Sequence, residues 1–162
     1  IAESKKFVPK HVQLTIVGSI GKALGVPGGV VAGSTNLIQK LRQSPSFTAA
    51  SPIAPAYLYA FLKAQPVYQE ARQKLKARIR QFQQAVHDSD LFSYFEDYPV
   101  FYTPHHELAA VLEDKLLLSS FPYPHPDSKP VTRVVLNALH TEEDIYQLSE
   151  AVKNYVYARS PQ

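Results

Sequence analysis

The segment Ser19–Gly29 reads SIGKALGVPGG and places one lysine, Lys22, between Gly21 and Gly25. The stretch VQLTIVGS runs into it, and its apolar and β-branched residues predict a buried strand. Lysine side chains usually remain in water on solvated surfaces. A lysine in a turn of small residues at the end of an apolar strand therefore indicates phosphate binding or covalent chemistry.

The phosphate-binding alternative fails on spacing. A nucleotide-binding P-loop has the pattern G-x-x-x-x-G-K-[ST]. Ala23 occupies the position of the hydroxyl residue, and Ile16 occupies the position of the first glycine. Covalent chemistry agrees better, because a desolvated lysine amine loses its proton and attacks a carbonyl. The hydroxyl of Ser19 is then a candidate ligand of a cofactor phosphate.

Two motifs resemble one known family. Ser19–Gly25 resembles the lysine motif T-[LM]-[GS]-K-[AS]-[FL]-G of fold-type I pyridoxal-phosphate enzymes, and it is most similar to the α-oxoamine synthases. The segment TRVVLNALHTEEDIYQL, residues 132–148, resembles a second pattern of that family, R-[LI]-R-x-x-[LI]-x-A-x-H-T-x-x-[DQ]-I. Arg133 takes the place of its second arginine, seven residues before His140, whereas Val131 replaces the first.

The resemblance implies a role for five residues. Lys22 would form the internal aldimine with pyridoxal 5'-phosphate and then act as the acid and base. Ser19, Thr48 and Ser51 would bind the cofactor phosphate, the last two across a homodimer interface. Arg133 would bind the carboxylate of an amino-acid substrate. The motifs leave two transferases open, a synthase that condenses the amino acid with an acyl-CoA and an aminotransferase.

The resemblance matches only the C-terminal part of the family. The aspartate that pairs with the pyridine nitrogen, the aromatic group that stacks on the ring and the glycine-rich phosphate loop would lie upstream. The chain begins IAESKK and contains no methionine. We therefore expect a fragment of a longer enzyme, inactive by itself. The alternative is a non-catalytic dimerisation or binding module of this fold. His11 lies about as far before Lys22 as a histidine that several members of the family carry near the cofactor, but the favoured interpretation is a residue at a strand entry.

The predicted fold is an α/β parent of fold type I, of which this chain supplies two strands of the large domain and an α+β C-terminal domain. We expect residues 1–50 to end the large domain, 51–88 to form an inter-domain helix and 89–162 to form the small domain. Threonines 35, 103 and 141 are predicted N-caps, the last in a capping box with Asp144. The predicted strands are residues 10–18, 28–34, 98–102, 116–121 and 131–139. The predicted helices are residues 36–43, 56–87 with a break at Pro66, 104–115 and 140–159.

The composition of the chain limits the classes of binding partner that we expect. The chain has 162 residues, of which 45% are hydrophobic and 19% charged, with a net charge of +3 and no cysteine. It has no apolar run long enough to cross a membrane. The basic stretch EARQKLKARIRQFQQ is typical of a solvated helix face, so nucleic acid is not an expected partner. His105 and His106 point to different faces of a helix, which argues against a metal site. The cytoplasm is the default location.

Overall fold

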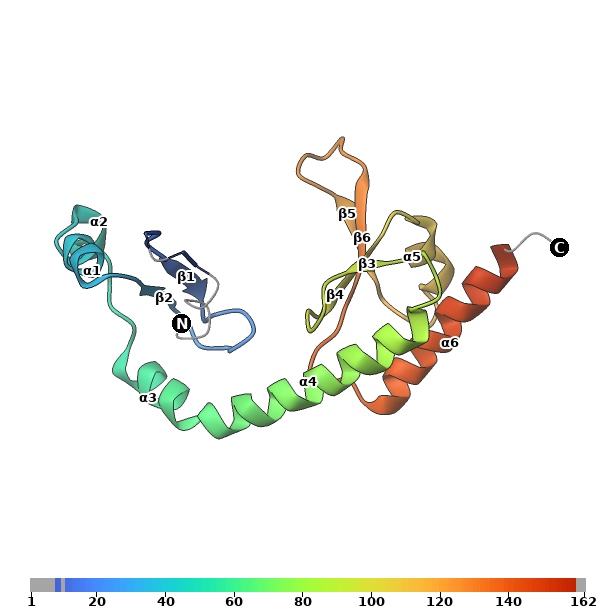
Figure 1. Cartoon of the computed structure of the whole chain (residues 1–162), viewed down its shortest axis with the longest axis horizontal. Coiled ribbons are helices and arrows are strands. Elements are labelled where there is room, and N and C mark those ends of the chain that lie inside the picture. The colour runs from blue at the N-terminus through green and yellow to red at the C-terminus, as the bar shows by residue number, and fades with distance from the viewer. Residues whose placement is uncertain (1–7, 10, 160–162) are drawn as a thin grey trace. The chain divides into compact units, whose positions relative to one another are not determined.

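Two units make up the computed structural model, which describes residues 8–9 and 11–159 (Figure 1). The first unit is Ile1–Tyr68 and the second is Gln69–Gln162. Within the described part of the chain, no helix is both long and apolar enough to cross a bilayer.

The first unit is built on an antiparallel hairpin of β1 (Ile16–Ser19) and β2 (Gly29–Ala32). The first strand was expected from Lys10, which lies outside the described residues, and it begins only at Ile16. The prediction that this strand is buried is wrong, since the side chain of Val17 is 74% exposed. A two-stranded ribbon has no second layer to cover its faces. Val26 is the only buried hydrophobic residue among those described in this unit.

Three helices follow the hairpin: α1 (Thr35–Arg42), α2 (Pro45–Thr48) and α3 (Pro55–Lys63). The N-cap of α1 is Ser34 rather than the predicted Thr35, because the Ser34 hydroxyl accepts the Leu37 N–H at 3.3 Å. Helix α2 is not among the helices predicted from the sequence. It forms because the Ser44 hydroxyl accepts the Phe47 N–H at 3.3 Å, and a proline follows at the first helical position.

The long helix predicted over residues 56–87 is two helices, α3 and α4 (Gln65–Val86), which meet at Ala64. Pro66 lies in the first turn of α4, so the predicted break is confirmed. Proline lacks an N–H and disfavours helical backbone in the residue before it, but it is tolerated in a first turn.

The second unit contains a four-stranded antiparallel sheet in the order β3-β4-β6-β5. Its strands are β3 (Ser93–Tyr94), β4 (Val100–Thr103), β5 (Ser119–Pro122) and β6 (Pro130–Val135). The sequence predicted three of these strands and missed β3, which has only two residues. The strand predicted over residues 131–139 ends at Val135, and the next residues turn towards the last helix.

One face of this sheet is covered. The core contains side chains from α4, α5 (Glu107–Leu112) and α6 (Glu142–Arg159). Phe101 of β4 lies opposite Val134 of β6, and both are buried. The ring of Phe101 is 0% exposed and meets Phe82 of α4 edge-on at 4.7 Å between centroids. Strand residues of the other parity, including Arg133, point to the opposite face.

Of the two N-caps predicted in this unit, one is confirmed and one is wrong. Thr141 and Asp144 form the expected capping box, with backbone–side-chain distances of 2.7 and 3.1 Å. Thr103 is not the N-cap of α5, which begins at Glu107 after His106. The Thr103 hydroxyl instead accepts the His105 N–H at 3.1 Å and closes a turn ahead of the helix.

Glu107 ties α5 to α6. Its carboxylate accepts the Tyr155 O–H at 2.7 Å and pairs with the Arg159 guanidinium. The Tyr155 hydrogen bond, the Glu107 backbone N–H and the Arg159 charge lower the pKa of this carboxyl from 4.5 to about 2. The charged form is therefore favoured by folding.

This network predicts a pH dependence of stability. The folded pKa is depressed, so the contribution of Glu107 is full above its ordinary pKa of 4.5 and is lost as pH falls towards about 2. Urea titrations between about pH 2 and pH 4.5 give the free energy of unfolding. This free energy should be lower for Glu107→Gln than for the unmodified chain near pH 4.5, and it should change less with pH. Glu113→Gln is the control, since the Glu113 side chain pairs with no described residue. Equal pH slopes for the chain and Glu107→Gln would contradict the assignment.

Candidate functional site

Lys22 lies in the turn that joins β1 to β2. The base of the turn is closed by two hydrogen bonds, from the Ile20 N–H to the Gly28 carbonyl at 3.0 Å and from the Val26 N–H to the Ile20 carbonyl at 3.1 Å. The Gly25 N–H donates to the Lys22 carbonyl at 3.2 Å, and Gly25 has a φ of +64°. The glycine after the lysine thus provides a left-handed conformation that other residues rarely adopt.

Two side chains from outside the turn hold it in place. The Tyr68 hydroxyl donates to the Leu24 carbonyl at 2.9 Å. Gly28 has a φ of +137°, and a Cβ there would come within 3.1 Å of the Ile53 side chain. The segment that leads into α3 therefore packs against the lysine turn.

The Lys22 side chain is exposed, and its ammonium has no hydrogen-bond or ion-pair partner among the described residues. The sequence gives one reason why Lys22 has no ion-pair partner. Glu3 is the only acidic residue before Glu70. The described part of the first unit therefore contains no carboxylate that could form an ion pair with the amine. The amine thus remains available for a bond to a ligand.

The three candidate phosphate ligands belong to the same unit as Lys22. Ser19 shares the turn, and its hydroxyl oxygen accepts the Gly21 N–H at 3.2 Å, which leaves its own proton free to donate. Thr48 uses its proton within α2, where its hydroxyl lies 3.1 Å from the Ser44 carbonyl. Ser51 is exposed in the segment between α2 and Ile53. Of the three candidates, Ser19 is therefore the one that lies next to Lys22 in the turn and has a free proton to donate.

Arg133 belongs to the second unit and lies on the sheet face away from the core. It is opposite Tyr102 of β4 and Ser119 of β5. Its guanidinium carbon lies 5.3 Å from the ring centroid of Phe121. Its Nε is buried and has no hydrogen-bond partner among the described residues. The sequence did not predict the Phe121 contact, although the two-residue alternation along β5 and β6 was a usable signal.

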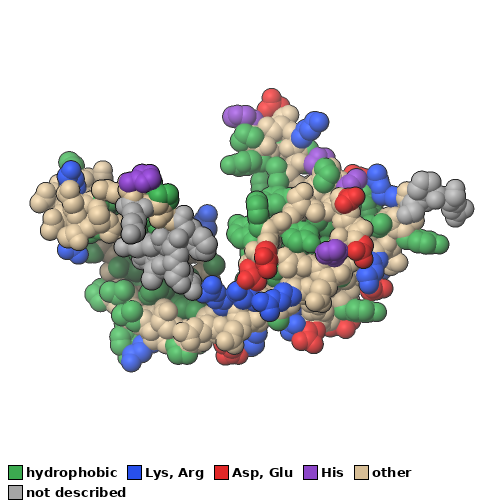
Figure 2. All heavy atoms as spheres, in the orientation of Figure 1, with side chains coloured by type: hydrophobic (Ala, Val, Ile, Leu, Met, Phe, Trp, Pro, Cys, Tyr) green, Lys and Arg blue, Asp and Glu red, His purple; other side chains and the backbone are tan. Residues whose placement is uncertain are grey.

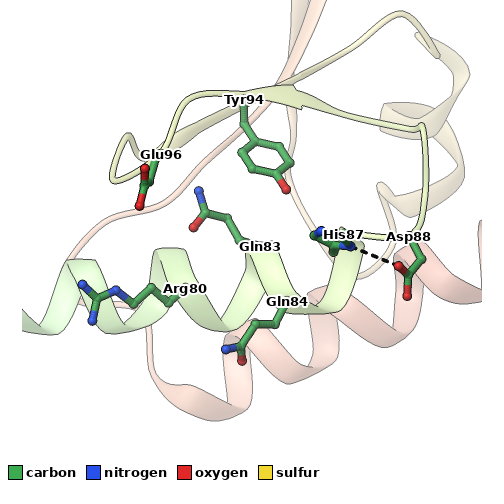
Figure 3. Close-up of a pocket in the computed structure, with 7 residues that line it drawn as sticks. All are labelled: Arg80, Gln83, Gln84, His87, Asp88, Tyr94 and Glu96. Atoms are coloured by element: carbon green, nitrogen blue, oxygen red, sulfur yellow. Dashed lines mark hydrogen bonds and ion pairs between the residues drawn. The ribbon is translucent and has the colours of Figure 1, made fainter.

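A hollow of about 440 Å³ lies between α4 and β3 (Figure 3). It is lined by Arg80, Gln83, Gln84, His87, Asp88, Tyr94 and Glu96. The figure shows side chains of both charges around the hollow, and His87 pairs with Asp88 at 3.0 Å. Since neither charge dominates and no unpaired lysine lines it, this hollow does not suit the chemistry expected of Lys22.

Comparison with known protein sequences identifies one family model and several relatives that match this chain. A model of the family "Aminotransferase class I and II" matches residues 2–152. The 8-amino-7-oxononanoate synthase of Thermosipho melanesiensis is 30% identical over 80% of this chain and 36% of its own length. That of Marinobacter nauticus is 32% identical over 90% of this chain and 42% of its length. A mouse mitochondrial 2-amino-3-ketobutyrate coenzyme A ligase is 30% identical over 86% of this chain and 37% of its length. The chain thus spans about two-fifths of the length of these relatives.

Comparison with solved structures agrees with the relationship found from the sequences. The 8-amino-7-oxononanoate synthase of Francisella tularensis superposes with a TM-score of 0.69 at 26% identity, over 90% of this chain and 46% of that one. A serine palmitoyltransferase of S. paucimobilis with a bound PLP–myriocin aldimine gives 0.68 at 16% identity, over 89% of this chain and 40% of that one. The second likeness concerns the fold alone. The resemblance and the fold class predicted from the sequence are confirmed.

The hydrogen bond from Tyr68 predicts a local effect on the lysine turn. Tyr68→Phe removes the bond to Leu24, which is worth about 1 kcal/mol. Amide hydrogen exchange at Gly25 and Val26, whose N–H groups close the turn, should become about five-fold faster. The control is Tyr59→Phe, since the Tyr59 hydroxyl bonds to no described residue. Equal effects of the two substitutions would show that Tyr68 does not hold the turn.

Proposed function

Because this chain belongs to the aminotransferase class I and II family, we propose that it carries the lysine-bearing C-terminal part of a pyridoxal-phosphate-dependent transferase of the α-oxoamine synthase kind. One observation carries the proposal most directly. The Lys22 amine lies exposed on a glycine turn, without an ion pair to any described residue. This amine is accessible to a carbonyl compound and is not occupied by another group of the described residues, although the desolvation expected from the sequence is not present in the described part of this unit.

The residues of the turn fit two ends of the cofactor. The Lys22 Nζ suits its aldehyde, and the free proton of the Ser19 hydroxyl suits a phosphate oxygen. A Cβ at Gly25 would meet no atom within 4 Å, so the turn leaves space beside the lysine. When bound, the cofactor supplies an electron sink for the bond broken at the amino-acid α-carbon.

Lys22 would have two tasks. Its Nζ would hold the cofactor covalently until a substrate arrives. The released amine would then take a proton from the substrate α-carbon or return one to it. Both tasks need the nitrogen of Lys22 to be free of an ion pair, and the described part of the first unit contains no carboxylate that could form one.

Arg133 would bind the substrate carboxylate. Guanidinium groups form two parallel hydrogen bonds with carboxylates, which fixes both the position and the orientation of the ligand. Arg133 has no carboxylate partner among the described residues, so its charge is not already neutralised.

The described part of the first unit does not provide every contact that the cofactor needs. The pyridine nitrogen needs an acidic partner, and the described part of the first unit contains none. The residues described around Lys22 would therefore form only part of the cofactor site. Residues 1–50 would complete the large domain, 51–88 would connect the domains and 89–162 would form the small domain.

The proposal includes a homodimer in the cytoplasm. Hydrophobic side chains cover α3 (Figure 2), and four of them are exposed: Tyr57, Leu58, Tyr59 and Leu62. Burial of such a surface against a second copy would stabilise a dimer. Thr48 and Ser51 precede this helix and would reach the cofactor phosphate of the second copy.

The substrates proposed are an amino acid and an acyl-CoA. The relatives include an 8-amino-7-oxononanoate synthase, a 2-amino-3-ketobutyrate coenzyme A ligase and a 5-aminolevulinate synthase, which favours condensation over amino transfer. The new bond would join the amino-acid α-carbon to the acyl carbon, with release of the CoA thiol and loss of the amino-acid carboxylate as carbon dioxide.

The proposed role of the Lys22 amine as a nucleophile predicts the effect of a conservative substitution on turnover. In the protein of natural length, Lys22→Arg keeps the charge but removes the nucleophile, so turnover should fall by about 10²–10⁴-fold or more. Release of CoA thiol is measured with several amino acids and acyl-CoAs, alongside keto-acid formation. Lys40→Arg, on exposed helix α1, is the matched control and should leave turnover unchanged.

Each result of this assay has a defined meaning. Thiol release that depends on Lys22 supports the synthase. Keto-acid formation without thiol release identifies an aminotransferase. Neither product from the unmodified protein, or equal turnover in Lys22→Arg, would contradict the enzymatic proposal and favour a non-catalytic binding module.

A further inference from the structure

Phe121 lies beside Arg133 on the exposed face of the small sheet. The Arg133 guanidinium carbon is 5.3 Å from the Phe121 ring centroid, which is within the range of a cation–π interaction. We propose that Phe121 is the positioning residue of Arg133, and that it directs the two terminal nitrogens of the guanidinium towards a ligand carboxylate. This inference rests on the carboxylate-binding role proposed for Arg133.

The register of the sheet produces this contact. Arg133 is directly opposite Ser119, and Phe121 is directly opposite Val131. Phe121 and Arg133 are therefore diagonal neighbours on the same face, a separation that aromatic and long side chains can bridge. The serine opposite Arg133 is small, so it leaves room for the guanidinium to lean towards the ring.

Two other residues, Tyr102 of β4 and Ser119 of β5, lie opposite Arg133 on the same face, and the Arg133 side chain makes no hydrogen bond to either of them. Its neighbours in β6, Thr132 and Val134, are buried on the core face and do not share its surface. Its side chain makes no ion pair with a described residue, and its Nε is buried without a hydrogen-bond acceptor. An arginine without a partner samples several rotamers. The Phe121 ring is thus the identified contact that restricts the guanidinium.

An aromatic ring restricts the cation without neutralising it. A carboxylate partner would hold the guanidinium but would compete with the substrate for its charge. The ring face attracts the cation through its quadrupole and leaves the N–H donors free. Because the Nε is buried, a carboxylate must approach from the Nη end. The ring therefore prepares Arg133 for end-on, two-point binding.

The first test is spectroscopic and does not depend on activity. In NMR spectra of the chain, ring currents should shift the Arg133 Hδ and Hε resonances upfield. Phe121→Leu, which keeps an apolar residue of similar size, should abolish the shift, and Phe121→Tyr should retain it. The control is Phe95→Leu, since Phe95 is an exposed ring that contacts Tyr98 instead. Unchanged Arg133 resonances in Phe121→Leu, with the fold intact by its other resonances, would overturn the positioning role.

The second test separates binding from chemistry in the protein of natural length. Phe121→Leu should raise the KM for the amino acid by about 3- to 30-fold, the range expected for loss of one cation–π contact. The kcat and the KM for the acyl donor should stay within about two-fold, and Phe121→Tyr should restore the amino-acid KM.

Arg133→Ala distinguishes the two proposals. If it raises the amino-acid KM and Phe121→Leu does not, the positioning role is wrong and the carboxylate role stands. If Arg133→Ala leaves the amino-acid KM unchanged, the carboxylate role is wrong, and the functional part of this inference falls with it.

Discussion

The register of β6 between β4 and β5 is the constraint on which the second unit depends. It turns Thr132 and Val134 into the core and Arg133 outwards. A slip of one residue would exchange the two faces, bury a guanidinium beneath the helices and expose Val134. Burial of an unpaired charge costs far more than a hydrophobic side chain gains. The hydrophobic core and the candidate carboxylate site are therefore fixed by the same pairing.

The first unit uses a different constraint to present its functional group. Its hairpin buries little hydrophobic surface, so the lysine turn depends on backbone geometry and a few contacts. Positive φ values at Gly25 and Gly28 shape the turn, and Tyr68 and Ile53 hold it from outside. The scarcity of acidic residues in this part of the chain keeps Lys22 unpaired. Composition and conformation thus act together on one amine.

The sequence predicted the elements with strong local signals. The break at Pro66 and the capping box at Thr141 were correct, because each depends on residues a few positions apart. The N-cap of α1 was misplaced by one residue, since Ser34 and Thr35 are both suitable hydroxyl residues. Strand β3 was missed because two residues carry no periodicity. The alternation along β5 and β6 indicates which residues share a face, but the Phe121–Arg133 contact also depends on cross-strand register, which that alternation does not give.

The central claim is that Lys22 is the covalent anchor of the cofactor. The most direct measurement treats the protein of natural length with pyridoxal phosphate, reduces it with borohydride and maps the modified residue by peptide mass spectrometry. We expect a reduced phosphopyridoxyl group on Lys22, in preference to the other lysines of the chain. A folded protein that carries no such group on Lys22, or carries it equally on Lys40 and Lys63, would contradict the account.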